Sequence, residues 1–128
     1  MAPELVRPLA GIHVLVIDDD ERERLFLRAV LQVWGALVTA ASTSEAEGAA
    51  LAADVIVCDV PTVEAAGAGF LDRLLQKHSQ PRRGLAMIAL LPAGTQRVPP
   101  HVAGRFQRHI IRPVNGDELR EMVRDLVR

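Results

Sequence analysis

Two β-branched apolar runs that end in carboxylates constrain the fold of this chain most strongly. The first spans His13–Asp20 and reads HVLVIDDD, and the second spans Asp54–Asp59 and reads DVIVCD. Runs of this kind are typical of strands buried on both faces of a parallel sheet. Because the carboxyl ends of neighbouring parallel strands meet at one edge of the sheet, we expect Asp18, Asp19 and Asp59 to lie close together there.

Strand-like and helix-like segments alternate along the whole chain. The hydrophobic spacing predicts strands over residues 13–17, 36–41, 55–58, 85–91 and 106–111. It predicts helices over residues 21–34, 44–53, about 70–75 and 116–127, the second and the last opened by the capping boxes SEAE and NGDE. Pro61 and Gly67 indicate a loop after Asp59, and the Pro99-Pro100 pair predicts an irregular segment over residues 95–104. Together these segments predict an α/β fold, a doubly wound five-stranded parallel sheet with helices on both faces.

Length, charge and cysteine content limit the function classes. The 128 residues fit one domain, which we place at residues 11–128, and residues 1–10, with two prolines, are predicted to be a linker or disordered segment of a longer protein. A net charge of −1 gives no attraction to nucleic acid, and no apolar run is long enough for a membrane span. The only cysteine, Cys58, lies in a predicted strand, which excludes an internal disulfide and agrees with a cytoplasmic location.

The expected carboxylate cluster has a specific chemistry. Carboxylates that share a site repel one another, and Mg²⁺ binds such oxygens together with substrate phosphate. Asp59 is then placed to accept a phosphoryl group, and Arg112, at the tip of the last predicted strand, to neutralise the phosphoryl oxygens. Other interpretations stay open: Asp18 and Asp20 as helix caps, and Arg112 as a surface cation.

In this order the residues resemble the receiver domain of two-component response regulators, over Gly11–Val127. The matching landmarks are Asp18-Asp19, Arg24, Gly35, Asp59, Gly67 and Arg112-Pro113, the last where the family has Lys-Pro. The resemblance implies the flavodoxin-like strand order 2-1-3-4-5. It also implies that Asp19, Asp59 and the backbone carbonyl of Pro61 hold Mg²⁺, with Asp18 acting through a metal-bound water.

The same resemblance implies partners and a reaction. The phosphoryl group on Asp59 would come from a sensor histidine kinase or a histidine phosphotransfer protein. The chain would be a single-domain relay, a piece of a hybrid histidine kinase, or a piece of a multidomain regulator with an output domain. It would act as a phosphoacceptor rather than as an enzyme. The Asp18–Asp20 run also fits haloacid-dehalogenase-type phosphatases, but the short chain without a cap insertion disfavours them.

Three positions depart from the family pattern. Leu91 stands where the family has the Thr or Ser that bonds the phosphoryl oxygen, and leucine cannot make that bond. Arg112 replaces Lys, and His109 takes the place of the switch aromatic, where we expect a packing role. These departures favour an alternative function, a pseudo-receiver that acts as an interaction module without phosphorylation.

Overall fold

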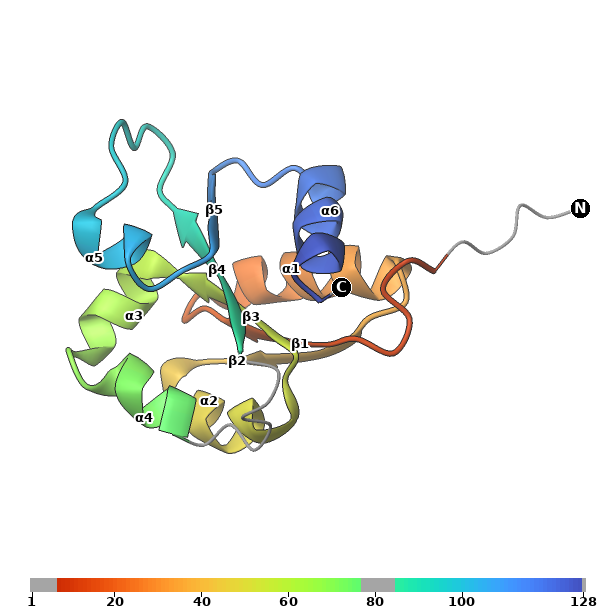
Figure 1. Cartoon of the computed structure of the whole chain (residues 1–128), viewed down its shortest axis with the longest axis horizontal. Helices are drawn as coiled ribbons and strands as arrows, with labels where there is room; N and C mark the ends of the chain where they lie inside the picture. Colours follow the sequence, from red (N-terminus) through yellow and green to blue (C-terminus); the bar gives the residue numbers. More distant parts are fainter. Residues whose placement is uncertain (1–6, 77–84, 128) are drawn as a thin grey trace, which may run out of the picture.

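The computed structural model describes residues 7–76 and 85–127 and contains a five-stranded, all-parallel sheet (Figure 1). Its strands are β1 (His13–Ile17), β2 (Leu37–Ala41), β3 (Val55–Asp59), β4 (Ala86–Leu91) and β5 (Arg108–Ile111). Their spatial order is β2-β1-β3-β4-β5, so β3 is the central strand. The predicted fold class and strand order are confirmed.

Helices cover both faces of the sheet. They are α1 (Glu21–Val33), α2 (Thr43–Ala49), the short 3₁₀ helix η1 (Ala50–Ala52), α3 (Val60–Ala66), α4 (Phe70–Gln76), α5 (Pro100–Ala103) and α6 (Gly116–Leu126). Helices α1 and α6 pack on one face, and α2, α3 and α4 pack on the other (Figure 1). This is the doubly wound arrangement that the alternating segments predict.

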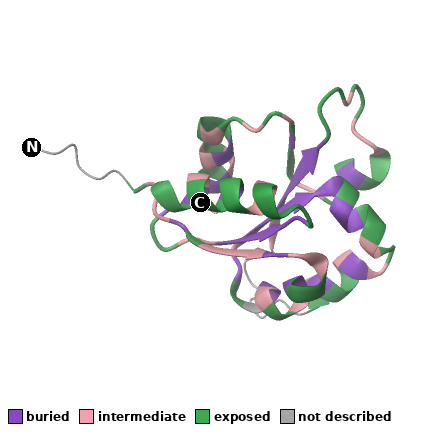
Figure 2. Cartoon of the chain, turned by 180° about the vertical axis from the view of Figure 1, so that it is seen from behind, coloured by how far each residue is buried: buried purple, intermediate pink, exposed green. Residues whose placement is uncertain are grey.

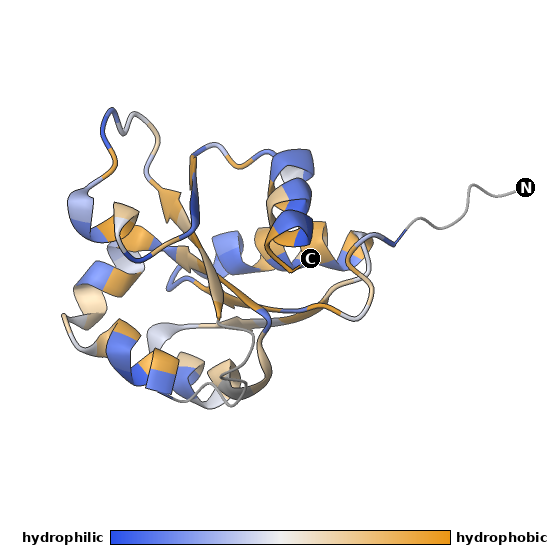
Figure 3. Cartoon of the chain, in the orientation of Figure 1, coloured by the Kyte–Doolittle hydropathy of each residue, from blue (hydrophilic) through white to orange (hydrophobic). Residues whose placement is uncertain are grey.

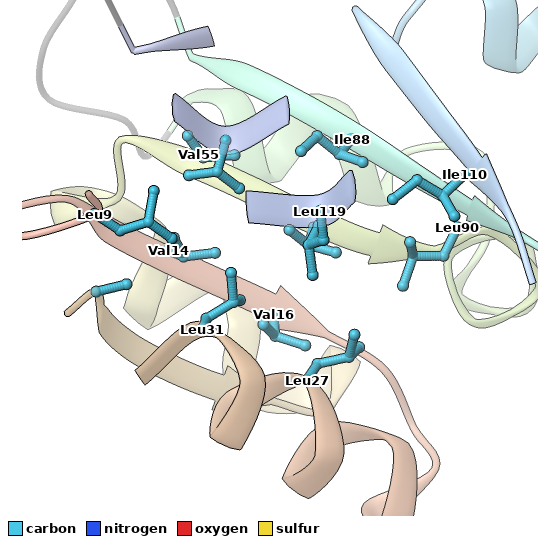
Figure 4. Packing of buried hydrophobic residues seen from close by; sticks show 13 residues of the cluster. Leu9, Val14, Val16, Leu27, Leu31, Val55, Ile88, Leu90, Ile110 and Leu119 are labelled. Carbon is cyan, nitrogen blue, oxygen red and sulfur yellow. The ribbon is translucent and has the colours of Figure 1, made fainter. Parts of the chain in front are cut away.

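The strands have apolar side chains on both faces, and successive residues alternate between two core clusters. Val14 and Val16 of β1 pack with α1 and α6, whereas Leu15 and Ile17 point to the opposite cluster. Figure 4 shows the first cluster between the sheet and the two helices. Strand β3 is buried at every residue, and hydrophilic residues gather on the outer helix surfaces (Figures 2 and 3). The packed core therefore holds the carboxyl ends of these central strands in place.

Several boundaries differ from the sequence prediction. Helix α3 begins directly after Asp59, where a loop was expected, because the Asp59 side chain caps it and proline is tolerated in a first helical turn. The segment after β4 ends in the four-residue helix α5, and β5 begins at Arg108. The capping box of α2 is formed by Ser42 and Glu45, two residues earlier than predicted.

The packed domain also begins earlier than residue 11. Leu9 is fully buried in the cluster under α1, and its backbone N–H donates to the Trp34 carbonyl at 3.0 Å. Residues 7–10 are therefore part of the domain, and the rest of the predicted linker, residues 1–6, lies outside the described residues. None of the helices described in residues 7–76 and 85–127 is long and apolar enough to cross a membrane.

Candidate functional site

One guanidinium lies among three carboxylates at the carboxyl end of the sheet. Arg112 follows β5, and its Nη2 atom lies 2.9 Å from Asp59 Oδ1, 2.7 Å from Glu23 Oε1 and 3.4 Å from Asp18 Oδ2. Its Nε also donates to Glu23 Oε1 at 2.8 Å. We call Asp18, Glu23, Asp59 and Arg112 the rim cluster. It joins β1, α1, β3 and β5, so the fold brings together residues almost a hundred positions apart.

Asp59 has its two carboxylate oxygens engaged with different partners. Oδ1 faces Arg112, and Oδ2 accepts hydrogen bonds from the Thr62 backbone N–H at 2.9 Å and from the Thr62 hydroxyl at 2.7 Å. The second oxygen thereby caps the first turn of α3. With its side chain 13% exposed, Asp59 is nearly enclosed but still reaches the surface.

Asp18 is the most deeply buried member of the rim cluster, with 2% of its surface exposed. Burial raises its pKa to about 6, an effect opposed by the Asp20 backbone N–H that bonds Oδ1 at 2.9 Å. The charges of Asp59 and Glu23 raise the same pKa further, and the nearby Arg112 lowers it. Arg24, on the first turns of α1, donates to the Asp18 backbone carbonyl at 2.7 Å and fixes the strand end.

Asp19 turns away from the rim cluster. Its side chain is exposed, and Oδ1 accepts from the Thr43 backbone N–H at 3.0 Å, at the start of α2. Its own backbone N–H donates to the Thr62 hydroxyl at 3.2 Å. Asp18 and Asp19, although adjacent in sequence, therefore bond different partners, Arg112 and Thr43.

Pro61 lies in the first turn of α3 and is exposed. In a helix the carbonyls point along the axis toward the carboxyl terminus and bond the amide four residues on. Its carbonyl is therefore directed along α3 and is not part of the loop that the sequence predicts after the strand.

The arrangement of these residues does not fit Mg²⁺. Within residues 7–76 and 85–127, no group of three or more Asp, Glu, His or Cys side chains is placed to hold a metal ion. Mg²⁺ needs several oxygens at near-octahedral positions. Here the facing oxygens of Asp18 and Asp59 contact Arg112, and the carboxylate of Asp19 points to Thr43.

The other two departures from the receiver pattern, Leu91 and His109, lie on β4 and β5. Leu91 ends β4, is 1% exposed and packs with Val60 and Val102. Its backbone carbonyl accepts from the Arg112 N–H at 3.0 Å, which positions the start of the Arg112–Pro113 cis peptide. His109 is exposed on the edge strand β5, so the packing role expected for it is wrong. Its neighbour Ile110 points into the core cluster, so His109 projects to the opposite side of β5.

Sequence reasoning missed two members of the site. Glu23 has the ordinary place of an acidic residue in a first helical turn, and only the position of Arg112 shows its second role. Thr62 follows Asp59 by three residues, the spacing at which a capping carboxylate bonds the helix backbone. This spacing could have predicted the cap, but the sequence predicts a loop at this point and therefore no helix for Asp59 to cap.

Similar solved structures are receiver domains. A response regulator receiver domain from Clostridium thermocellum matches with a TM-score of 0.70 and 20% identity, over 91% of this chain and 94% of that one. The chain has the receiver fold. A chain of the complex between the histidine kinase ThkA and the response regulator TrrA shares this receiver fold, with a TM-score of 0.69 and 22% identity over 91% and 99% of the two chains.

A longer protein contains the same receiver fold. NtrX from Brucella abortus, solved with ADP, matches with a TM-score of 0.73 and 19% identity over 90% of this chain. The match spans only 26% of the NtrX chain, so this chain corresponds to about a quarter of that protein's length. No protein-family model matches the sequence, and no match was found among curated proteins.

Proposed function

We propose that the chain is a cytoplasmic phosphoacceptor domain of two-component signalling, with Asp59 as the phosphoacceptor. The observation that carries the proposal is the placement of Asp59 at the end of the central strand, with the Arg112 guanidinium 2.9 Å from Oδ1. A carboxylate at the carboxyl edge of a doubly wound sheet, paired with a cation, has the two parts that phosphoryl transfer needs. The receiver fold of the solved neighbours supports the same function.

The proposed donor is a phosphohistidine on a histidine kinase or a histidine phosphotransfer protein. A carboxylate oxygen of Asp59 attacks phosphorus, the P–N bond breaks, and the imidazole leaves with the electron pair and takes up a proton. Arg112 then balances charge on the phosphoryl oxygens, and the Thr62 hydroxyl, 2.7 Å from Oδ2, holds the carboxylate in position. A structural neighbour that is a complex of a response regulator with a histidine kinase supports this kind of partner.

The domain is proposed to work within a larger assembly. NtrX contains a receiver fold as about a quarter of its length. An output domain, or the kinase part of a hybrid protein, would supply the response that a domain of this size lacks. The partner protein and the signal then determine when Asp59 is modified.

Two observations favour a second function, an interaction module that does not need phosphorylation. Both oxygens of Asp59 already have protein partners, and Leu91 places a buried methyl-bearing side chain where the resemblance implies a hydroxyl. In a pseudo-receiver the rim cluster would be a structural element, and partners would bind the unmodified domain.

Transfer onto Asp59 separates the two functions. The protein is incubated with acetyl phosphate or phosphoramidate, with and without Mg²⁺, and its intact mass is measured. We expect the mass of one added phosphoryl group in the wild type and none in Asp59→Asn. A wild type that stays unmodified under every condition, while circular dichroism shows it folded, would overturn phosphoacceptance and support the interaction module.

A further inference from the structure

The rim cluster contains its own cation. Arg112 Nη2 contacts one oxygen from each of Asp18, Glu23 and Asp59, and its side chain is only 19% exposed. A guanidinium has five N–H donors in a fixed planar fork, so it can bond several carboxylates at once. A lysine ammonium on its flexible stem does this less readily. Arg112 thus places its positive charge against all three carboxylates of the rim cluster.

The remaining oxygens of the two buried carboxylates are also satisfied by the protein. Asp18 Oδ1 accepts from the Asp20 N–H, and Asp59 Oδ2 accepts from Thr62. Buried carboxylates that already have hydrogen bonds and a charged partner lose these interactions when they turn toward an added ion. A divalent ion between Asp18 and Asp59 therefore competes with Arg112 for Oδ2 of Asp18 and Oδ1 of Asp59.

Two anchors keep Arg112 in place. The backbone N–H of Arg112 bonds the Leu91 carbonyl at the end of β4, and its Nε bonds Glu23 at 2.8 Å. Glu23 lies in the first turn of α1. Because the side chain is held at both ends, its displacement by an ion breaks contacts to α1 as well as to the two aspartates.

We propose that the Arg112 guanidinium is the resident cation of the rim cluster and takes the place of a divalent ion between Asp18 and Asp59. One guanidinium leaves three carboxylates partly uncompensated, so an ion is still attracted to the cluster, but it binds only by displacing Arg112. The cluster is consequently stable without metal. This inference goes beyond the proposed function and does not depend on phosphoryl transfer.

The test measures metal binding directly. Mn²⁺ binding is followed by the loss of the free-ion electron paramagnetic resonance signal, and melting temperatures are recorded with and without MgCl₂. We expect Arg112→Gln to bind Mn²⁺ at least about ten-fold more tightly than the wild type, and its melting temperature, lower without metal, to rise with Mg²⁺. The wild-type melting temperature should stay unchanged in Mg²⁺ at roughly ten millimolar.

Arg108→Gln is the matched control. Arg108 lies on β5, the strand that ends just before Arg112, and its Nη2 pairs with Asp125 Oδ2 at 3.8 Å, so the variant removes one positive charge without touching the rim cluster. It should behave as the wild type. Equal Mn²⁺ affinity in wild type and Arg112→Gln would overturn the inference, as would an equal gain in Arg108→Gln.

The inference is testable even if Arg112→Gln does not fold. Saturable Mn²⁺ binding by the wild type below about one millimolar would by itself overturn it. Arg112→Lys, which keeps the charge but loses the fork, should bind Mn²⁺ more tightly than the wild type. The intact-mass experiment on Asp59 reads a different property, so failure of phosphoacceptance and failure of this inference are distinguishable.

Discussion

At the scale of single residues, the rim cluster shows how burial and pairing oppose each other. Asp18 is buried and has a cation within 3.4 Å, yet its pKa lies near 6 because the loss of solvent outweighs the attraction of Arg112. A carboxyl group with a raised pKa takes up a proton more readily in the folded than in the unfolded chain. Its ionisation therefore costs stability at neutral pH, and the cost disappears as pH falls through about 6.

This cost predicts how stability changes with pH. When the pH is lowered from about 7.5 to about 5, protonation of Asp18 should raise the free energy of unfolding by about 1 kcal/mol, because the pKa of this carboxyl group is 3.8 in the unfolded chain and about 6 in the folded one. Asp18→Asn, which keeps the Oδ1 acceptor, should lose this gain and be as stable as the wild type or more so at pH 7.5. Urea unfolding at both pH values measures it. The exposed Asp125→Asn serves as control, and parallel pH profiles for wild type and Asp18→Asn would contradict the assignment.

Thr62 gives a second prediction at this scale. Thr62→Val keeps the shape of the side chain but removes the hydroxyl that bonds Asp59 and accepts from the Asp19 N–H. Because the hydroxyl bonds a nearly buried carboxylate, we expect a loss of about 1.5–3 kcal/mol in unfolding free energy. Thr95→Val, which removes an exposed hydroxyl bonded to the Pro92 carbonyl, should cost less. Equal losses in chemical denaturation would argue against a special role for Thr62.

The sequence predicts part of this cluster and not the rest. Strand ends of a parallel sheet share an edge, so the proximity of Asp18, Asp59 and Arg112 follows from the strand pattern alone. The direction of the Asp19 side chain does not, because it depends on a backbone donor of α2 that comes 24 residues later. Glu23 is missed for the same reason, since its partner lies 89 residues away.

At the scale of elements, local signals give the type of each segment better than its ends. The capping residues Asp20 and Asn115 correctly predict where α1 and α6 begin. Helix α3 is missed because proline after Asp59 suggests a turn, although a proline in the first turn loses no hydrogen bond. The outcome depends on the Asp59 cap, and sequence alone does not show whether a carboxylate is available as a cap or committed elsewhere.

The end of α1 supplies the prediction at this scale. Gly35 has a φ of +98°, and an added Cβ would lie 2.9 Å from the Arg7 Cβ. Gly35→Ala should therefore lower the free energy of unfolding by about 1–3 kcal/mol. Gly48→Ala, in the exposed interior of α2 with open space around it, should raise it by about 0.5–1 kcal/mol. Thermal and urea denaturation compare the two, and a similar change in both would contradict the constraint on Gly35.

At the scale of the whole molecule, the alternation of strands and helices is enough to predict the sheet. Each central strand is apolar at consecutive positions because it is covered on both faces, and this pattern is readable without knowledge of contacts. The early start of the domain at residue 7 is not readable, since Leu9 lies between Pro8 and a glycine turn and is buried through tertiary contacts in the cluster formed by the sheet, α1 and α6. Linker-like composition and core membership can thus coincide.

The position of each strand in the sheet predicts its local stability. Strands β1, β3 and β4 have neighbours on both sides, whereas β2 and β5 are the edges. Amide hydrogens of β3 and β4 should exchange with solvent only through global unfolding, and those of β5 at least about ten-fold faster. Hydrogen exchange followed by NMR or mass spectrometry reports this. Uniform protection across all five strands would contradict it.

Asp59 is at once the last residue of the central strand and the cap of the helix that follows. A group attached to this carboxylate, or a neutral residue in its place, thereby changes the acceptor that holds the α3 amide and hydroxyl of Thr62. Fraying of the first turn of α3 therefore reports whether the two oxygens of the Asp59 carboxylate are free or modified. Backbone NMR of Thr62 would report that state even before any partner protein is known.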